Sequence, residues 1–186
     1  MYTVFLSGSR KLSRLNDEIR DRLQTVIDKD FKIIVGDANG ADKAFQSHLA
    51  KVGYTHVIVF CSGSTCRNNV GAWEQKNVHV DNKLSGREFY TQKDKAMAAE
   101  ADYGFVIWDG KSAGSISNVL ELLKNQKPSV VYFSPDKTFH AVKSPTDAKQ
   151  LMQLADAGDY RIVNEKISFD RRVRELGNGT QASLSL

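Results

Sequence analysis

The sequence predicts an open, Rossmann-like α/β fold in which a mainly parallel sheet carries helices on both faces. Two observations lead to this fold class. Short apolar segments rich in β-branched residues alternate along the chain with amphipathic segments of helical length. Strands that alternate with helices in this way are typical of parallel pairing through crossover helices. At 186 residues, the chain is long enough to bury one sizeable core.

The elements follow one another from the first residues onward. Apolar side chains from Leu12 to Ile27 recur every three or four positions, as they do on one face of an amphipathic helix. The expected strands are residues 3–7, 31–35, 56–60, 103–108 and 129–133, and the expected helices are residues 12–27, 41–51, 87–101 and 115–125. Residues 61–85 are the least regular part, which we interpret as a long loop with a short strand at 78–80. Candidates for a lid flank this loop and are Trp73, Arg87 and Tyr90.

The C-terminal part of the chain is interpreted as a smaller extension. We expect a nucleotide-binding domain over residues 1–134, a helical extension over residues 135–176 and a disordered tail over residues 177–186. Within the extension, Ser144 and Pro145 are typical of a helix start. Serine accepts a backbone hydrogen bond at the N-cap, and proline fits the first helical position.

Composition and cysteine usage favour a cytoplasmic protein. No apolar run approaches the roughly 20 residues that a membrane span needs, and the first residues lack a basic leader, so no secretory signal is expected. Cys61 and Cys66 are the two cysteines, and no second pair completes a zinc site. We therefore expect reduced thiols and no metal. The net charge of +4 permits an anionic partner without demanding nucleic acid.

Three glycine-rich loops follow predicted strands, and in a parallel sheet such loops emerge at the same carboxyl edge. They read SGSR at 7–10, GDANGAD at 36–42 and DGKSAGS at 109–115. Glycine lets the backbone approach a ligand, and each loop leads toward a helix N-terminus, whose free N–H groups favour phosphate. None is a Walker A loop or a GxGxxG motif, so a P-loop NTPase or a dehydrogenase is a poor match. Together the three loops predict a phosphate-bearing nucleotide ligand.

The expected ligand-binding residues come from these loops. They are Gly8, Ser9, Arg10, Gly36, Asp37, Asn39, Gly40, Ala41, Asp42, Trp108, Gly110, Lys111, Ser112, Gly114 and Ser115. Arg10 and Lys111 would add charge-assisted bonds to phosphate. Asp42 is either a site residue or an early-helix carboxylate that complements the helix dipole. Trp108 either stacks on a base or packs at the end of its strand.

The loops, in this order and spacing, resemble those of the SLOG superfamily. SGSR, VGDANGAD, and KDKAMAAEAD leading into FVIWDGKSAGS carry the resemblance, which spans roughly residues 1–133. The superfamily contains LOG-type phosphoribohydrolases, the DprA and Smf proteins, and small bacterial YspA/YpsA-like domains. The chain is most similar to the small domains, although Asp37 replaces the second glycine of their GGA-x-GAD loop. The resemblance implies a Rossmann-like domain that binds nucleotides or their derivatives, including NAD-derived, ADP-ribose-type and cyclic signals.

The resemblance also implies roles for residues outside the glycine loops. LOG-type enzymes combine an arginine before a methionine-containing helix with a PGGxGTxxE motif. In this chain Lys93 takes the position of the arginine, and Asn118 takes the position of the glutamate. The resemblance therefore adds both residues to the expected ligand-binding set. Cleavage of an N-glycosidic bond needs a carboxylate that activates water, which asparagine does not supply. Glu121 is either a substitute carboxylate or a solvated helix-face residue. With Asp42 and Lys93 it completes the catalytic candidates.

Three functions remain open from the sequence. We rank a nucleotide-derivative sensor or regulator first, a nucleotide N-glycosidase second and DprA-like single-stranded DNA binding third. Asn118 weakens the second, and the lack of an evident basic, aromatic-lined groove weakens the third. No cofactor beyond the nucleotide ligand and no membrane partner are expected. LOG-type relatives pair through helices beside the site, and an apolar stripe with Phe89, Ala96 and Met97 therefore predicts a homodimer.

Overall fold

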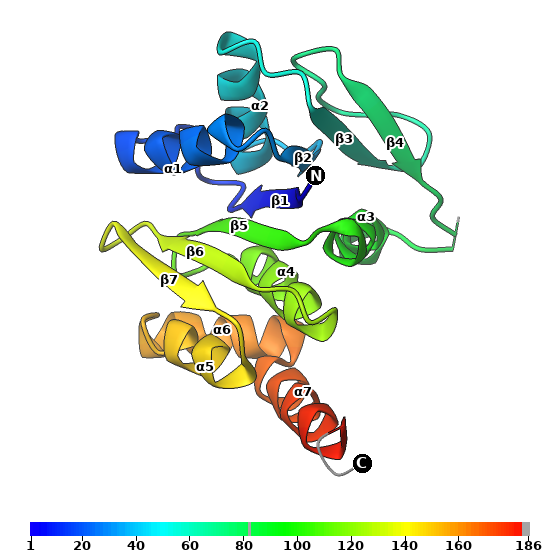
Figure 1. Ribbon diagram of the computed structural model, residues 1–186. Coiled ribbons are helices and arrows are strands. Elements are labelled where there is room, and N and C mark those ends of the chain that lie inside the picture. The colour runs from blue at the N-terminus through cyan, green and yellow to red at the C-terminus, as the bar shows by residue number, and fades with distance from the viewer. Residues whose placement is uncertain (82, 184–186) are drawn as a thin grey trace.

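The computed structural model describes residues 1–81 and 83–183 and confirms the α/β fold class (Figure 1). Within these residues one sheet has the strand order β4-β3-β2-β1-β5-β6-β7, and its neighbouring strands are parallel except β6 and β7. The strands are β1 Thr3–Gly8, β2 Lys32–Gly36, β3 Val57–Ser62, β4 Glu74–Val78, β5 Tyr103–Trp108, β6 Ser129–Phe133 and β7 Thr138–Val142. The helices are α1 Asp17–Asp28, α2 Ala41–Lys51, α3 Gly86–Glu100, α4 Ala113–Lys124, α5 Pro145–Met152, α6 Ala157–Ile167 and α7 Phe169–Ser183. No helix in the described ranges has both the length and the apolar character needed to cross a membrane.

Helices cover both faces of the central sheet. Successive side chains of a strand point to opposite faces, so each central strand contributes side chains to two cores. Phe5 and Ile34 belong to the core formed with α3, α4 and the C-terminal helices. Leu6 and Val35 belong to the core formed with α1 and α2, which lie together on the other side of the sheet (Figure 1). This double burial explains why the strands read as nearly continuous apolar runs.

The order of the strands reverses its direction at β1, which lies between β2 and β5. Gly8 at the end of β1 is in register with Ile107 of β5. The helix after β1 covers one face of the sheet and the helix after β5 covers the other, so a crevice opens outside the carboxyl ends of these two strands. The loops after β1, β2 and β5 share this edge, as the sequence predicts.

The C-terminal part belongs to the same core as the rest of the chain. β7, which the sequence analysis missed, pairs antiparallel with β6, and Phe169 of α7 is buried with side chains of α4 and β5. α5 begins as predicted, because Ser144 Oγ accepts the Asp147 N–H at 3.2 Å and Asp147 Oδ2 accepts the Ser144 N–H at 2.9 Å. The tail that we expect to be disordered from residue 177 is helical to Ser183, and its last residues, 184–186, lie outside the described chain.

The structure corrects three further expectations. Cys61 and Cys66 form a disulfide at the start of the long loop, where the sequence predicts reduced thiols. The strand in this region is Glu74–Val78 and not 78–80. It is an exposed edge strand with mainly polar side chains, so it does not form the apolar run by which strands were predicted. Met97 of the predicted apolar stripe on α3 is buried in the core, so it is not available to a second copy of the chain, and the homodimer stays a prediction.

Gly40→Ala is expected to destabilise the fold more than Gly53→Ala. Both glycines have positive φ, 83° and 69°, and such strained backbone costs other residues about 1–3 kcal/mol. A β-carbon at Gly40 would also lie 2.3 Å from the carbonyl oxygen of Arg10, whereas one at Gly53 would meet no atom within 4 Å. Denaturant unfolding compares the two variants. Equal losses of unfolding free energy would contradict tight packing of Gly40 on the loop after β1.

Candidate nucleotide-binding cleft

A cleft of about 820 Å³ opens outside the carboxyl ends of β1 and β5, where ligands bind in open α/β sheets. Its lining comes from β1 and the loop that follows it, from the loop after β5, from the first half of α4, from α3, from the loop after β2 with the first turn of α2, and from one residue of α6. Its cationic side chains are Arg10, Lys11, Arg87, Lys93, Lys111 and Lys166, and its carboxylates are Asp42, Asp94 and Asp109. The cleft therefore combines a cationic lining with carboxylates that hold part of that charge in place.

Asp109 joins the loop after β5 to the loop after β1. Its Oδ2 accepts a hydrogen bond from Ser9 Oγ at 2.7 Å. Its Oδ1 accepts the backbone N–H groups of Lys111 at 3.1 Å and Ser112 at 2.7 Å. Ser112 is the N-cap of α4, and its Oγ accepts the Ser115 N–H at 3.3 Å. This chain of bonds sets the position of the α4 N-terminus relative to β1.

The first turn of α4 leaves two backbone N–H groups for a ligand. Ala113 and Gly114 line the cleft, and their N–H groups have no acceptor in the part of the chain that is described. A β-carbon on Gly114 would meet only Ser112 Oγ, at 3.9 Å, so the space beside it is open. The turn carries no acidic residue. Free N–H groups and the positive end of the helix dipole favour an anion at this point.

The loop after β2 packs against the loop after β1, and the first N–H group of the helix that follows it is already in use. The Ala41 N–H donates to the Ser9 carbonyl at 3.2 Å. Gly8 permits this contact, because a β-carbon there would lie 2.7 Å from the β-carbon of Ala41. Gly40 contacts Arg10 from the same side. The first turn of α2 also carries the carboxylate of Asp42, whereas the first turn of α4 carries no acidic residue, so the α4 start is the better anion site.

Asp37 and Asn39 bind the long loop and not the cleft. Asp37 Oδ1 lies 2.6 Å from Arg67 Nη2, and its Oδ2 lies 3.0 Å from both Nε and the backbone nitrogen of Arg67. Burial alone would raise the pKa of Asp37, but the hydrogen bonds from Arg67 outweigh it and hold that pKa below its ordinary value. Asn39 Oδ1 accepts from Asn68 Nδ2 at 3.1 Å.

A buried lysine–carboxylate cluster forms the inner wall of the cleft. Lys93 is only 3% exposed, and its Nζ lies 2.8 Å from Asp94 Oδ1 and 4.0 Å from Asp42 Oδ2. Burial alone would lower the pKa of Lys93, but the two carboxylates outweigh it and raise that pKa. Burial raises the pKa of Asp42 to about 6, against the opposing charge of Lys93. Gly36 makes room for the cluster, since a β-carbon there would lie 2.5 Å from Lys93 Nζ.

The structure brings about half of the sequence-predicted residues to the cleft. Those that line it are Gly8, Ser9, Arg10, Asp42, Lys93, Lys111, Ser112, Gly114 and Asn118. Those that do not are Gly36, Asp37, Asn39, Gly40, Ala41, Trp108, Gly110, Ser115 and Glu121. Trp108 is fully buried, with its ring 5.3 Å from that of Phe133, so no base stacks on it. Glu121 Oε1 accepts from Arg172 Nη2 at 2.8 Å and ties α4 to α7, and we assign it to packing.

Tyr90 and Lys166 line the cleft but are missing from the predicted ligand-binding set. Two guanidinium groups lie over the Tyr90 ring: that of Arg67 is 4.3 Å from the ring centroid, and that of Arg10 is 5.5 Å from it. Lys166 reaches the cleft only because α6 packs against α4, which no local pattern in the sequence indicates. Asp109 also lines the cleft and is missing from that set, but its role has a local signal in the sequence. An aspartate before Gly-Lys-Ser at the end of a strand is typical of a turn whose backbone N–H groups bond to the aspartate carboxylate.

No metal centre is evident beside the cleft. Across residues 1–81 and 83–183, no group of three or more His, Cys, Asp or Glu side chains is placed to hold a metal ion.

Comparison with known proteins shows the fold and leaves the ligand open. No protein-family model matches the chain, and no curated sequence matches it significantly. Among solved structures, the chain is similar to DNA processing protein A from Helicobacter pylori, whose structure describes a mode of single-stranded DNA binding. The TM-score is 0.57 at 16% identity, over 90% of this chain and 80% of that protein. The two chains share a Rossmann-like fold.

Asp42→Asn is expected to flatten the pH dependence of stability between about pH 4 and pH 6. The pKa of Asp42 is about 6 in the folded protein against an ordinary value of 3.8, so the folded state holds the proton more tightly than the unfolded state. The contribution of Asp42 to the free energy of unfolding therefore falls as the pH rises through this window, by about 3 kcal/mol in total. Asparagine carries no proton to lose and still accepts from the Ala38 N–H.

The measurement is urea unfolding of both proteins at several pH values in this window. The two stability curves should diverge as the pH rises, with the variant gaining relative to the wild type. Parallel curves would show that Asp42 ionises normally.

Proposed function

We propose that the cleft binds the phosphate group of a nucleotide or nucleotide derivative, as a sensor or regulator. The observation that carries this proposal is the free first turn of α4, where the N–H groups of Ala113 and Gly114 line the cleft. Arg10 and Lys111 line the same cleft and would add charge-assisted bonds. Its volume of about 820 Å³ falls within the roughly 300–1,000 Å³ of small-molecule sites.

Contacts with the C-terminal helices enclose one side of the cleft. Arg87 Nη1 donates to the Lys166 carbonyl at 3.2 Å and connects α3 to α6. Lys111 Nζ lies 3.2 Å from Asp159 Oδ2 and connects the loop after β5 to α6. A partly enclosed cleft removes water from a bound phosphate and strengthens its hydrogen bonds. This enclosure supports a ligand of nucleotide size.

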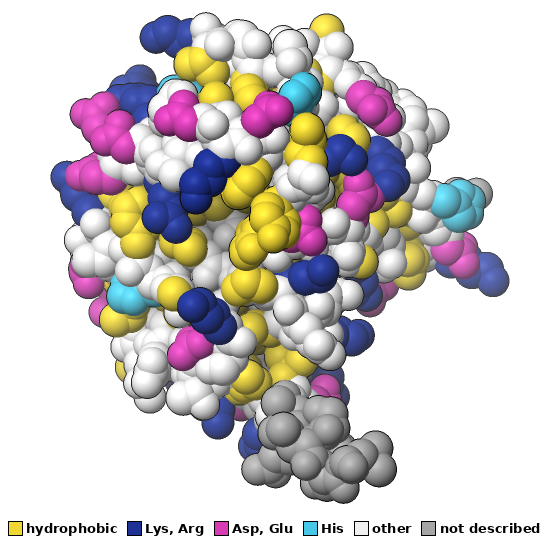
Figure 2. All heavy atoms as spheres, viewed as in Figure 1, with side chains coloured by type: hydrophobic (Ala, Val, Ile, Leu, Met, Phe, Trp, Pro, Cys, Tyr) yellow, Lys and Arg dark blue, Asp and Glu magenta, His cyan; other side chains and the backbone are white. Residues whose placement is uncertain are grey.

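Single-stranded DNA is the second candidate, and the similarity to DNA processing protein A favours it more directly than it favours a free nucleotide. A phosphate within a strand presents the same oxygen atoms to α4 as a phosphate of a free nucleotide does. On the face shown in Figure 2, Lys and Arg side chains alternate with Asp and Glu and do not form one broad basic surface. A strand bound on this face would therefore follow a local path of cations.

We expect binding without hydrolysis of nucleoside monophosphates. Asn118 Nδ2 donates to Ser7 Oγ at 2.6 Å in the cleft, and an amide does not activate water. The absence of one general base typically costs about 10²–10⁴ in rate. Chromatography of a nucleotide panel after incubation should show no free base. Robust base release that is lost in Asp42→Asn would instead identify a glycosidase whose carboxylate is Asp42.

Gly114→Val is expected to abolish nucleotide binding while leaving the fold intact. The valine would project into the open space beside the α4 N–H groups. Gly158→Val is a matched control, because Gly158 is also the second residue of a helix, has open space around it and does not line the cleft. Calorimetry with AMP, ADP-ribose and a cyclic nucleotide measures the effect. Equal affinity in both variants would overturn the assignment of the phosphate site.

A further inference from the structure

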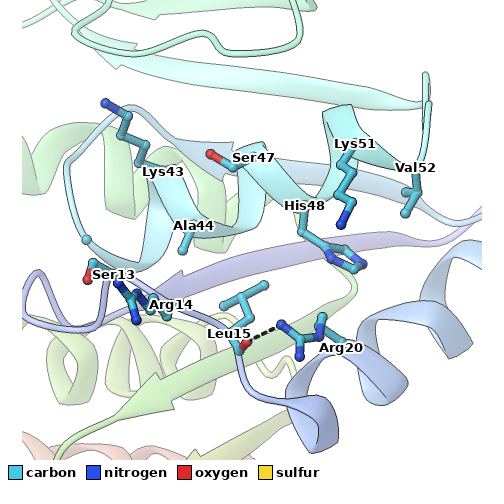
Figure 3. A pocket seen from close by; sticks show the side chains of 11 residues that line it. Ser13, Arg14, Leu15, Arg20, Lys43, Ala44, Ser47, His48, Lys51 and Val52 are labelled. Carbon is cyan, nitrogen blue, oxygen red and sulfur yellow. Dashed lines mark hydrogen bonds between the residues drawn. The ribbon is translucent and has the colours of Figure 1, made fainter.

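A second hollow, of about 790 Å³, lies between α2, the start of α1 and the segment that joins β1 to α1 (Figure 3). We call it the α1–α2 groove. Its cationic side chains are Arg14, Arg20, Lys43 and Lys51, and no acidic side chain of the described chain lines it. Leu15, Ala44 and Val52 add apolar surface. The composition differs from that of the cleft, where carboxylates accompany the cations.

Three of the four cations are available to a ligand. Arg14, Lys43 and Lys51 form no ion pair or hydrogen bond through their side chains with any described residue, and all three are exposed. Arg20 is held in place, because its Nη1 donates to the Leu15 carbonyl at 2.6 Å and its Nη2 pairs with Asp17. The groove therefore carries positive charge that the protein itself does not neutralise.

His48 points from α2 into the space toward α1, as Figure 3 shows. Its Nε2 is buried and has no hydrogen-bond partner among the described residues. Burial, together with the charges of Arg20 and Lys51, lowers the pKa of the imidazole below its ordinary value. A buried polar atom without a partner is destabilising. This atom has no exposed surface, so the exposed cations, and not Nε2 of His48, are the groups that a ligand in the groove would contact.

The cations of the groove are far enough apart to contact more than one phosphate. Lys43 and Lys51 are separated by about two turns of α2, which corresponds to about 12 Å at 1.5 Å per residue. Figure 3 shows Lys43 and Arg14 toward one end of the groove, and Lys51 and His48 toward the other. A nucleic acid strand carries one charge about every 3.4 Å of helix axis in B-form DNA, and so presents several phosphates over this length.

Neighbouring residues of the segment after β1 line the cleft and the groove. Arg10 and Lys11 line the cleft, and Ser13 and Arg14 line the groove. Gly40, at the end of the groove, packs directly on the backbone of Arg10. A strand that extends from the cleft across this segment would reach the groove. No acidic side chain of the described residues lines the groove.

We propose that the α1–α2 groove binds the sugar–phosphate backbone of a single-stranded nucleic acid, one nucleotide of which occupies the cleft. The inference rests on the proposed function and deepens it, since it makes the nucleotide in the cleft one unit of a strand. Arg14, Lys43 and Lys51 contact successive phosphates. The apolar side chains of the groove contact sugars and bases between them.

The test compares Lys43→Gln/Lys51→Gln with Lys124→Gln/Lys149→Gln. The control pair also removes two exposed lysines near helix ends that form no ion pair with a described residue, and neither lines the groove or the cleft. The probes are a fluorescein-labelled 20-nucleotide oligothymidylate and thymidine monophosphate, measured over a range of salt concentrations. For single strands each phosphate contact contributes about 0.7 to the slope of log affinity against log salt.

The groove pair should therefore make the slope for the oligonucleotide shallower by about 1.4 and weaken its binding severalfold, with binding of the mononucleotide unchanged. The control pair should behave as the wild type. Unchanged slope and affinity in the groove pair would overturn the inference, as would wild-type protein that binds the oligonucleotide no more tightly than the mononucleotide. Displacement of the oligonucleotide by oligoglutamate of equal charge at equal concentration would overturn it in favour of general anion binding.

Failure of the groove is distinguishable from failure of the cleft. If Gly114→Val loses the mononucleotide while the groove pair has no effect, the proposed function stands and the inference about the groove falls. If Gly114→Val retains the mononucleotide, the cleft assignment itself falls.

Discussion

The hydrogen bonds of the Asp109 carboxylate are the constraint on which the cleft depends. One oxygen atom accepts from Ser9 Oγ and the other from two backbone N–H groups of the following loop. The carboxylate thus connects the ends of two adjacent parallel strands at the point where the strand order reverses. Because Ser112 begins α4 immediately after these bonds, the position of the free helix N-terminus follows from them.

Two helix starts that look alike in sequence have different roles because of packing. Both α2 and α4 follow a glycine-rich loop at the same edge of the sheet. At the α2 start, Ala41 donates to Ser9, Gly40 lies on Arg10, and the first turn carries the carboxylate of Asp42. The α4 start remains free and lines the cleft. The loop after β2 instead supplies Asp42, which reaches the buried Lys93 and shapes the inner wall.

Much of the fold followed from local patterns, and less of the site did. Apolar periodicity located the central strands, and glycine loops located the edge of the sheet at which the cleft opens, because both depend on neighbouring residues. β4 was misplaced because its residues are polar, and β7 was missed because only pairing with β6 makes it a strand. The roles of Glu121 and Trp108 depend on Arg172 and Phe133, which are distant in sequence and adjacent only after folding. The α1–α2 groove had no sequence signal, since its cations are spaced as on any solvated helix face.

The measurement that tests the phosphate site most directly is an amide NMR titration with AMP. A phosphate held by the first turn of α4 would shift the backbone N–H resonances of Ala113 and Gly114 most, together with those of the loop after β1. The N–H resonance of Ala41, which is already bonded to Ser9, should move much less. The account predicts that pattern of saturable shifts. Saturable shifts that leave Ala113 and Gly114 unchanged would contradict it.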